Sequence, residues 1–193
     1  MNPWYAKAVI LAASSAIVVI RAPHGKRSSA IPIVTNRRGA LEVALLIVAW
    51  IAFFFPLVWI ATPALSFADY PLRPAALAAG ASLLATGLWL LWRSHADLGS
   101  NWSVSLQLRE EHALVTHGLY RRVRHPMYLA LLVFSLGEAL AIPNWLVGPW
   151  CPVAMVLIVA FRVGPEEQMM RDGFGKDYEE YAAASWHLVP RVW

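Results

Sequence analysis

Long apolar stretches separated by short polar segments dominate the chain as far as about residue 161. They cover residues 4–20, 43–68, 75–92 and 127–161, and the only charged residues within them are Lys7 and Glu138. A helix that crosses the hydrocarbon of a bilayer needs about 20 mainly apolar residues. The pattern therefore predicts a helical protein that crosses a membrane several times.

The fourth stretch is too long for one crossing. At about 1.5 Å per residue, a single helix over residues 127–161 would measure roughly 52 Å. The sequence Ile142-Pro143-Asn144-Trp145 near its middle is typical of a tight turn. We therefore expect two short helices that form a hairpin, and five transmembrane helices in all.

The basic residues favour this count. The segments after the first, third and fifth expected helices hold all of the 16 Lys and Arg residues except Lys7 and Arg73. Because basic residues gather on the cytoplasmic side of membrane proteins, we expect the N-terminus outside and the C-terminus in the cytoplasm. Basic residues follow the first stretch rather than precede it, so we expect a retained helix rather than a cleaved signal peptide.

Composition agrees with the membrane class. Of 193 residues, 59% are hydrophobic and only 15% are charged, which is too few charges to cover a soluble domain of this size. The net charge of +4 follows from membrane topology, so we expect no nucleic-acid partner. We predict one all-α integral membrane domain over residues 1–193, located in the inner or plasma membrane of the cell. Residues 1–92 hold the first three spans, and residues 93–193 form the half that carries the chemistry.

Metal and nucleotide motifs are absent from the sequence. His112 and His117 are five positions apart, which places them on different faces of a helix, and there is no H-E-x-x-H. Neither G-x-x-x-x-G-K-[ST] nor G-x-G-x-x-G occurs, and Cys151 is the one cysteine. We expect no metal and no Rossmann-type nucleotide site.

The sequence Arg124-His125-Pro126 precedes the fourth expected helix. Pro126 suits the first turn of a helix, where its missing N–H costs nothing. His125 and Tyr128 would then lie at a helix N-terminus, which favours an anionic or acceptor-rich ligand. The alternative is a basic collar at the membrane interface with an interfacial tyrosine and no ligand.

Acidic and aromatic residues follow the fifth expected helix. We expect this helix to end at Gly164, and Pro165 to open a new helix with Glu166 and Glu167 in its first turn. Arg162 could bind a carboxylate, and a glutamate could bind hydroxyls or an ammonium group. The spacing of the next aromatic and apolar residues predicts a C-terminal amphipathic helix. Its stripe comprises Met170, Phe174, Tyr178 and Tyr181.

Glu138 lies about ten residues inside the fourth span, where a carboxylate is expensive unless it is paired or faces a cavity. One interpretation is that it lines a substrate tunnel and meets a polar group of the substrate. The other is that it lies near the outer interface and extends its carboxylate to water from a short helix.

These stretches together resemble the isoprenylcysteine carboxyl methyltransferase family, whose pattern runs L-V-x-x-G-x-Y, R-H-P-x-Y, an apolar hairpin, R, E-E and F-G-x-x-Y-x-x-Y. The matching residues are Leu114, Val115, Gly118, Tyr120, Arg124, His125, Pro126, Tyr128, Arg162, Glu166, Glu167, Phe174, Gly175, Tyr178 and Tyr181. The segment from Leu98 to Ser103 also looks like the bacterial and archaeal members. Each fragment is weak by itself, but the ordered set over about residues 95–190 is specific.

The resemblance implies a helical membrane enzyme that transfers a methyl group from S-adenosyl-L-methionine to a lipophilic acceptor entering from the bilayer. Carried over by position, the cofactor would contact His112, Ala113, Leu114, Val115, Tyr120, His125, Pro126, Met127, Tyr128, Glu166 and Glu167, with Ser105 or Gln107 as a further polar contact. Arg162 would face the acceptor carboxylate. Glu138 is not part of the family pattern, and only the first of its two interpretations would place it further along the substrate tunnel. A carboxylate acceptor is ionised at pH 7 and needs no base, whereas an amine acceptor could give its proton to His125 or to a glutamate.

Three other functions compete with this one. A phospholipid N-methyltransferase has a similar C-terminal architecture. An NADPH-dependent sterol or enone reductase shares a related membrane half but generally needs more than five spans. A membrane scaffold or sensor without enzymatic activity is the third.

Overall fold

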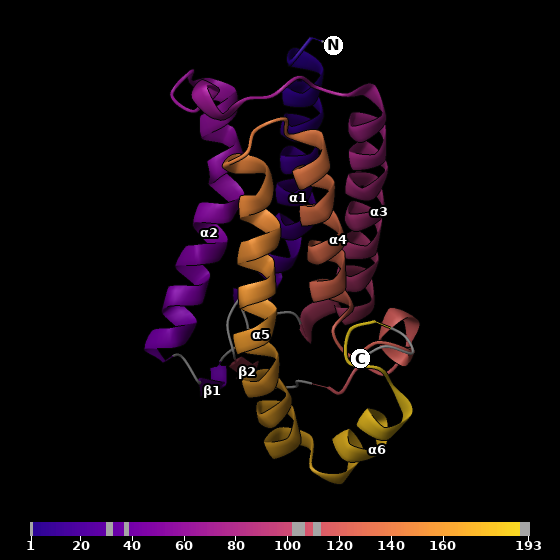
Figure 1. Ribbon diagram of the computed structural model, residues 1–193. Helices are drawn as coiled ribbons and strands as arrows, with labels where there is room; N and C mark the ends of the chain where they lie inside the picture. Colours follow the sequence, from indigo (N-terminus) through magenta and orange to yellow (C-terminus); the bar gives the residue numbers. More distant parts are fainter. Residues whose placement is uncertain (1, 30–32, 37–38, 102–106, 110–112, 190–193) are drawn as a thin grey trace.

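The computed structural model describes residues 2–29, 33–36, 39–101, 107–109 and 113–189, which form a bundle of helices (Figure 1). The helices are α1 (Trp4–Ser29), α2 (Ala40–Ala61), α3 (Pro74–Leu98), α4 (Pro126–Ala141), α5 (Val147–Phe174) and α6 (Lys176–Ala184). Single 3-10 turns lie at η1 (Ser66–Ala68), η2 (Gly99–Asn101) and η3 (Gly118–Arg121).

The long helices have the length and composition of membrane spans. Segments Trp4–Gly25, Ala40–Ala61, Pro74–Leu98 and Val147–Phe174 are long and apolar enough to cross a bilayer, and α4 is a shorter apolar helix. Large apolar side chains such as Val19 and Ile47 are exposed on the outside of the bundle, as they are on surfaces that face lipid. The chain is a polytopic helical integral membrane protein.

Two predicted boundaries in the C-terminal half are confirmed. Helix α4 begins at Pro126, with the proline in its first turn. Helix α4 ends at Ala141 and α5 begins at Val147, so the predicted turn around Pro143 separates two helices. A third prediction is wrong: α5 does not end at Gly164.

Helix α5 continues through Pro165 to Phe174 and ends where Gly175 adopts a left-handed conformation with φ of 54°. Pro165 removes one backbone donor, but the side chains on both sides of it, Val163 and Glu167, are buried. We infer that this packing outweighs the lost hydrogen bond. The expected amphipathic stripe is therefore divided between two helices. Met170 and Phe174 lie on α5, whereas Tyr178 and Tyr181 lie on α6.

A short antiparallel ribbon adds a feature that the hydrophobic pattern did not predict. Strands β1 (Ile33–Asn36) and β2 (Gln107–Arg109) pair with Ile33 opposite Arg109 and Asn36 opposite Gln107. Three or four residues are too few to show a readable alternation. The ribbon lies at the same end of the bundle as α6, as Figure 1 shows.

Helices α3 and α4 approach each other closely along a line of small residues. A Cβ atom added to Gly80 would lie 2.8 Å from the backbone of Gly137, and one added to Gly137 would lie 2.7 Å from the backbone nitrogen of Leu84. Small residues of this kind allow membrane helices to pack backbone to backbone. This contact fixes α4, which carries several of the polar residues described below.

The end of the bundle that carries the N-terminus is joined by polar side chains. Asn144 donates to Asp69 Oδ1 at 2.7 Å and to the Leu65 carbonyl at 2.8 Å, while its own oxygen accepts from the Val147 amide at 3.0 Å. Trp59 Nε1 donates to the same Asp69 oxygen at 2.9 Å. We call this group (Trp59, Asp69 and Asn144) the Asn144 cluster. It ties the turn between α4 and α5 to the α2–α3 connection.

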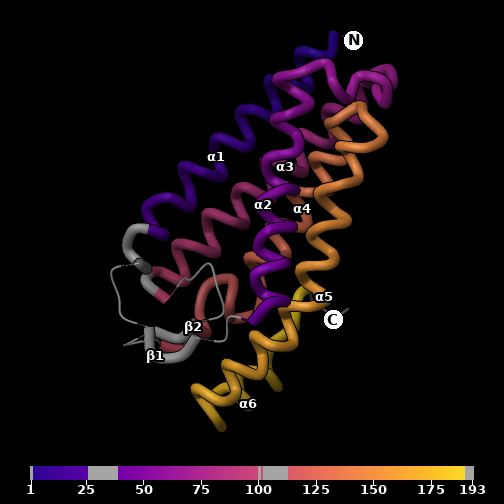
Figure 2. The backbone as a smooth tube through the Cα atoms, turned by 90° about the vertical axis from the view of Figure 1, so that its left-hand side faces the viewer, coloured from indigo at the N-terminus to yellow at the C-terminus, as the bar shows by residue number. Residues whose placement is uncertain are grey.

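Figure 2 shows the bundle from the side, where α1 and α5 diverge toward the end that carries β1, β2 and α6. The helices therefore separate most at the end opposite the Asn144 cluster.

Candidate functional site

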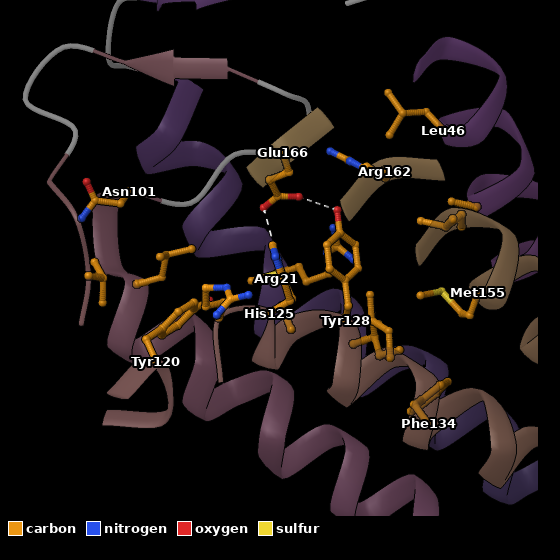
Figure 3. Close-up of a pocket in the computed structure, with 18 of the residues that line it drawn as sticks. Arg21, Leu46, Asn101, Tyr120, His125, Tyr128, Phe134, Met155, Arg162 and Glu166 are labelled. Carbon is orange, nitrogen blue, oxygen red and sulfur yellow. Dashed lines mark hydrogen bonds and ion pairs between the residues drawn. The ribbon is translucent and has the colours of Figure 1, made fainter. Parts of the chain in front are cut away.

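A cavity of about 570 Å³ lies within the bundle between α1, α2, α4 and α5, and it extends to residues 113–115, Tyr120 and α6 (Figure 3). Polar side chains from three helices line the part nearest α6. We call this group the polar end of the cavity; it consists of Arg21, His125, Tyr128, Arg162 and Glu166. Most of the remaining wall is apolar and includes Leu46, Trp50, Phe53, Phe134 and Met155.

Glu166 is the acidic group of the polar end. The Tyr128 hydroxyl donates to Glu166 Oε2 at 2.7 Å, and His125 Nδ1 lies 3.9 Å from Glu166 Oε1, as Figure 3 shows. The rings of His125 and Tyr128 are neighbours, with centroids 5.7 Å apart. The N-terminus of α4 and the middle of α5 thus present a histidine, a phenol and a carboxylate to one space.

The adjacent glutamate has a different environment. Glu167 Oε1 accepts from Arg124 Nε at 2.7 Å and is hydrogen-bonded to His125 Nε2 at 3.0 Å. Arg171 approaches Glu167 Oε2 at 3.3 Å, and His187 Nε2 lies 3.6 Å from the same atom. Glu167 is buried and is not among the residues that line the cavity. Neighbouring positions on a helix point about 100° apart, which explains why Glu166 faces the cavity and Glu167 faces this network.

Arg124 fixes the chain that follows α6. Its Nη1 donates to the carbonyls of Ala182 at 2.8 Å and Ser185 at 2.6 Å, and its Nη2 donates to His187 Nδ1 at 2.6 Å. The backbone amides of Arg124 and His125 donate to the carbonyls of Trp186 and His187. The buried guanidinium therefore couples the start of α4 to the C-terminal segment, and it holds His125 in place.

Arg162 is paired with an acid from the second helix. Its Nη2 lies 3.2 Å from Oε1 of Glu42, in the first turn of α2, and both side chains are largely buried. Figure 3 shows Arg162 on the wall of the cavity between Glu166 and Leu46. A buried ion pair on the wall of a cavity holds a positive charge where a ligand can reach it.

Three tyrosines, Tyr120, Tyr178 and Tyr181, line the cavity beside the polar end, and we call them its floor. The Tyr181 hydroxyl donates to the Tyr120 carbonyl at 2.7 Å, and Tyr178 is buried beside Glu167. Burial raises the pKa of Tyr181 to about 12 and raises the pKa values of Tyr120 and Tyr178 further. All three phenols are therefore neutral at physiological pH, and all three residues line the cavity.

Two residues near the end of α3 order the loop over residues 113–120. Asn101 Oδ1 accepts from the Ala113 amide at 2.9 Å, and Asp97 Oδ2 accepts from the Leu119 amide at 2.9 Å. Arg93 pairs with Asp97 at 2.8 Å on the same helix. These contacts hold the loop against the cavity.

The structure brings most of the sequence-predicted site residues to the cavity. Those that line it are Ala113, Leu114, Val115, Tyr120, His125, Met127, Tyr128, Glu138, Arg162 and Glu166. Pro126 and Glu167 are not among the lining residues. Pro126 begins α4, and Glu167 belongs to the Arg124 network. His112 and Ser105 lie outside the described residues, and Gln107 is described only by its backbone in β2.

Sequence reasoning missed the contributions of the first two helices. Arg21 of α1 lines the cavity, and Glu42 of α2 pairs with Arg162. A signal for Glu42 exists, because an acid at the start of a strongly apolar helix is costly unless it is paired. The identity of its partner depends on how α2 and α5 pack, which the sequence pattern does not give.

Within the described residues, no group of three or more His, Cys, Asp and Glu side chains is arranged to hold a metal ion.

A family model described as phospholipid methyltransferase matches residues 75–177, which is more than half of the chain. Protein-S-isoprenylcysteine O-methyltransferase A of Arabidopsis thaliana is 37% identical over 93 residues, covering 46% of this chain and 45% of that protein. A probable protein-S-isoprenylcysteine O-methyltransferase of Oryza sativa subsp. japonica is 35% identical over 83 residues, covering 41% of each chain. The chain spans less than half the length of these curated relatives.

The structure of a eukaryotic intramembrane Ras methyltransferase, an isoprenylcysteine carboxyl methyltransferase, resembles this fold with a TM-score of 0.56 and 25% sequence identity. The similarity covers 82% of this chain and 55% of that one. These comparisons confirm the resemblance that the motifs indicated.

Proposed function

Because the chain belongs to the phospholipid methyltransferase family, we propose that it transfers a methyl group from S-adenosyl-L-methionine to a carboxylate on a lipophilic acceptor. The observation that supports this most is the cavity itself, which joins a polar end containing Glu166 and Arg162 to long apolar walls. A lipid with a charged end group fits such a space. The relatives are named for isoprenylcysteine, so an isoprenylcysteine-like acceptor is the first to test.

The polar end suits the chemistry of the cofactor. When bound, S-adenosyl-L-methionine supplies a methyl group on a positively charged sulfur. Glu166 offers a carboxylate to a cation, and neutral Tyr120, Tyr178 and Tyr181 line the same cavity, where an aromatic ring could also contact the sulfonium. Ala113, Leu114, Val115, His125, Met127 and Tyr128 would complete this binding surface. We propose that Pro126 and Glu167 act from behind it, through the start of α4 and the contact with His125.

Arg162 would hold the acceptor carboxylate by a charge-assisted pair. An ionised carboxylate needs no general base at pH 7, so the residues must mainly orient the acceptor and exclude water. Glu42 would position Arg162, because it pairs with the guanidinium from the opposite helix at 3.2 Å. The apolar wall around Trp50 and Phe53 would keep water from the reacting groups.

We further propose the membrane arrangement that the basic residues indicate. Helices α1 to α5 would make five spans, with the N-terminus outside and the polar end in the cytoplasmic leaflet. At 16 residues, α4 measures about 24 Å and would need the neighbouring helices to shield its ends. Residues 1–92 and 93–193 would act as one domain, with cofactor contacts mainly in the second part.

A second candidate is a phospholipid N-methyltransferase, which the description of the matching family favours. An amine acceptor must lose a proton, and His125 beside Glu166 could accept it. The two candidates differ in product. A carboxyl methyl ester releases methanol in base, whereas an N-methyl group does not.

Binding of S-adenosyl-L-methionine to the detergent-purified chain tests the cofactor assignment. Glu166→Gln should weaken this binding tenfold or more, because it removes a charge that faces the cavity (~1.5 kcal/mol). Glu179→Gln makes the same chemical change at an exposed position on α6 and should alter the affinity less than about twofold.

Labelled methyl transfer to farnesylcysteine and to phosphatidylethanolamine, followed by base treatment, then identifies the acceptor class. A folded protein that binds no S-adenosyl-L-methionine, or that binds it equally well after Glu166→Gln, would overturn the proposal.

A further inference from the structure

Among the residues that the structure describes, one carboxylate lies in the apolar part of the cavity, away from the polar end. Glu138 of α4 lines the cavity and is 2% exposed. Its Oε2 atom is buried and has no hydrogen-bond partner among the described residues. Cys151 of α5 also lines the cavity and is hydrogen-bonded to Glu138, and Ala52 of α2 packs against Cys151.

Extension to water from a short helix does not explain this residue, because its side chain is directed into the bundle and has almost no exposed surface. A buried acceptor without a partner carries a free-energy cost. Three helices nevertheless form a space around it that a ligand can reach.

The position of Glu138 gives the length of that ligand. Ten residues separate Glu138 from Tyr128 on α4, which corresponds to about 15 Å along the helix. Eleven residues separate Cys151 from Arg162 on α5, or about 16 Å. Both walls therefore place this carboxylate about 15 Å from the polar end, with apolar side chains such as Phe134 and Met155 between them.

We propose that Glu138 recognises a hydrogen-bond donor, such as a hydroxyl group, on the distal part of a lipophilic acceptor whose carboxylate lies at Arg162. The substrate class is thus a lipid carboxylate with a polar group about 15 Å along its chain. This inference rests on the proposed function for the placement of the carboxylate. A purely apolar chain, such as the prenyl group of farnesylcysteine, would leave the Glu138 oxygen without a partner, so we expect such an acceptor to bind more weakly than one with a hydroxyl group at this position.

Two probes that differ in one atom test the proposal: ω-hydroxydodecanoate and dodecanoate. Their affinities for the full chain in detergent micelles are compared by competition with a fluorescent fatty acid, a measurement that needs no methyl transfer. The hydroxylated probe should bind at least tenfold more tightly to the unaltered protein. Glu138→Leu should reduce that ratio to about one, and Glu138→Gln should keep most of it, because its amide oxygen still accepts a hydrogen bond.

Ser135→Ala is the matched control. Ser135 is also buried on α4, one turn earlier, but does not line the cavity, so this variant should keep the preference. An equal preference in the unaltered protein and in Glu138→Leu, or no preference in the unaltered protein, overturns the inference. A preference that depends on Glu138 in a protein without methyl transfer would instead overturn the proposed function and leave this recognition site standing.

Discussion

At one end of the bundle, Asn144 and Asp69 tie two connections together, whereas at the other end Glu166 and Tyr128 face a cavity. Both ends bury polar side chains in an apolar protein. In the Asn144 cluster, the amide uses both its oxygen and its nitrogen on protein groups within hydrogen-bond distance. At the polar end, the same kinds of group line a space large enough for a ligand.

This difference indicates that the Asn144 cluster contributes mainly to stability and the polar end of the cavity mainly to ligand binding. Polar groups that pair with one another inside a membrane protein hold helices and turns in place. Polar groups that line a cavity can contact a ligand in addition to their protein partners, so they are the ones that select it. The comparison predicts that substitutions at the two ends will affect different measurements.

The largest effect is expected at Arg162. Arg162→Gln should lower kcat/KM for the lipophilic acceptor about a thousandfold, or about 4 kcal/mol, because the acceptor carboxylate loses its cation in a water-poor site. This fall in kcat/KM is measured from the rate of labelled methyl transfer at saturating S-adenosyl-L-methionine and varied acceptor concentration.

The same substitution removes the Arg162 cation from the buried Glu42 carboxylate, so it also lowers stability. The double variant Glu42→Gln with Arg162→Gln removes both charges and should recover the melting temperature while activity stays low. Recovery of activity in the double variant would show that Arg162 only neutralises Glu42.

The second-largest effect is a loss of stability, and we expect it in the Asn144 cluster at the opposite end of the bundle. Asn144→Leu removes the donors to Asp69 and Leu65 and the acceptor for the start of α5. We expect a loss of about 3 kcal/mol, which lowers the melting temperature by roughly 8 °C, while the affinity for S-adenosyl-L-methionine stays within about twofold. Ser66→Ala, at an exposed position of the same end, should shift melting by less than about 2 °C. Weaker cofactor binding without a change in melting would contradict the separation of the two ends.

The sequence predicted the local features of this comparison. Pro126 marked the start of α4, Pro143 and Asn144 marked the break before α5, and the ordered motif indicated His125, Tyr128 and Glu166 as one site. Each of these signals depends on residues that are near one another in the chain or on a family pattern. Apolar length alone was enough to indicate the membrane class.

The remaining features depend on tertiary packing. The pairing of Glu42 with Arg162 joins residues 120 positions apart, and the course of α5 through Pro165 depends on buried neighbours such as Glu167. Arg21 is a topological signal in the sequence, but in the structure it lines the cavity. No local pattern distinguishes a basic residue at the membrane interface from one that turns into the bundle.

The smallest expected effect is on stability at high pH, and it concerns Tyr181 at the polar end of the cavity. Burial raises the pKa of Tyr181 to about 12, so the folded protein holds its phenol proton more tightly than the unfolded chain does. The stability that this tyrosine contributes is therefore complete below about pH 10, the usual value, and is lost as the pH rises toward 12. The melting temperature should fall between pH 9 and 11, and Tyr181→Phe should reduce the loss of stability over this range by less than about 1 kcal/mol, since the side chain is partly exposed. At pH 7 this variant loses the 2.7 Å hydrogen bond to the Tyr120 carbonyl, worth about 1 kcal/mol. An unchanged alkaline slope in Tyr181→Phe would mean that this phenol does not titrate differently in the folded protein, and that the floor of the polar end is more open to water than its packing indicates.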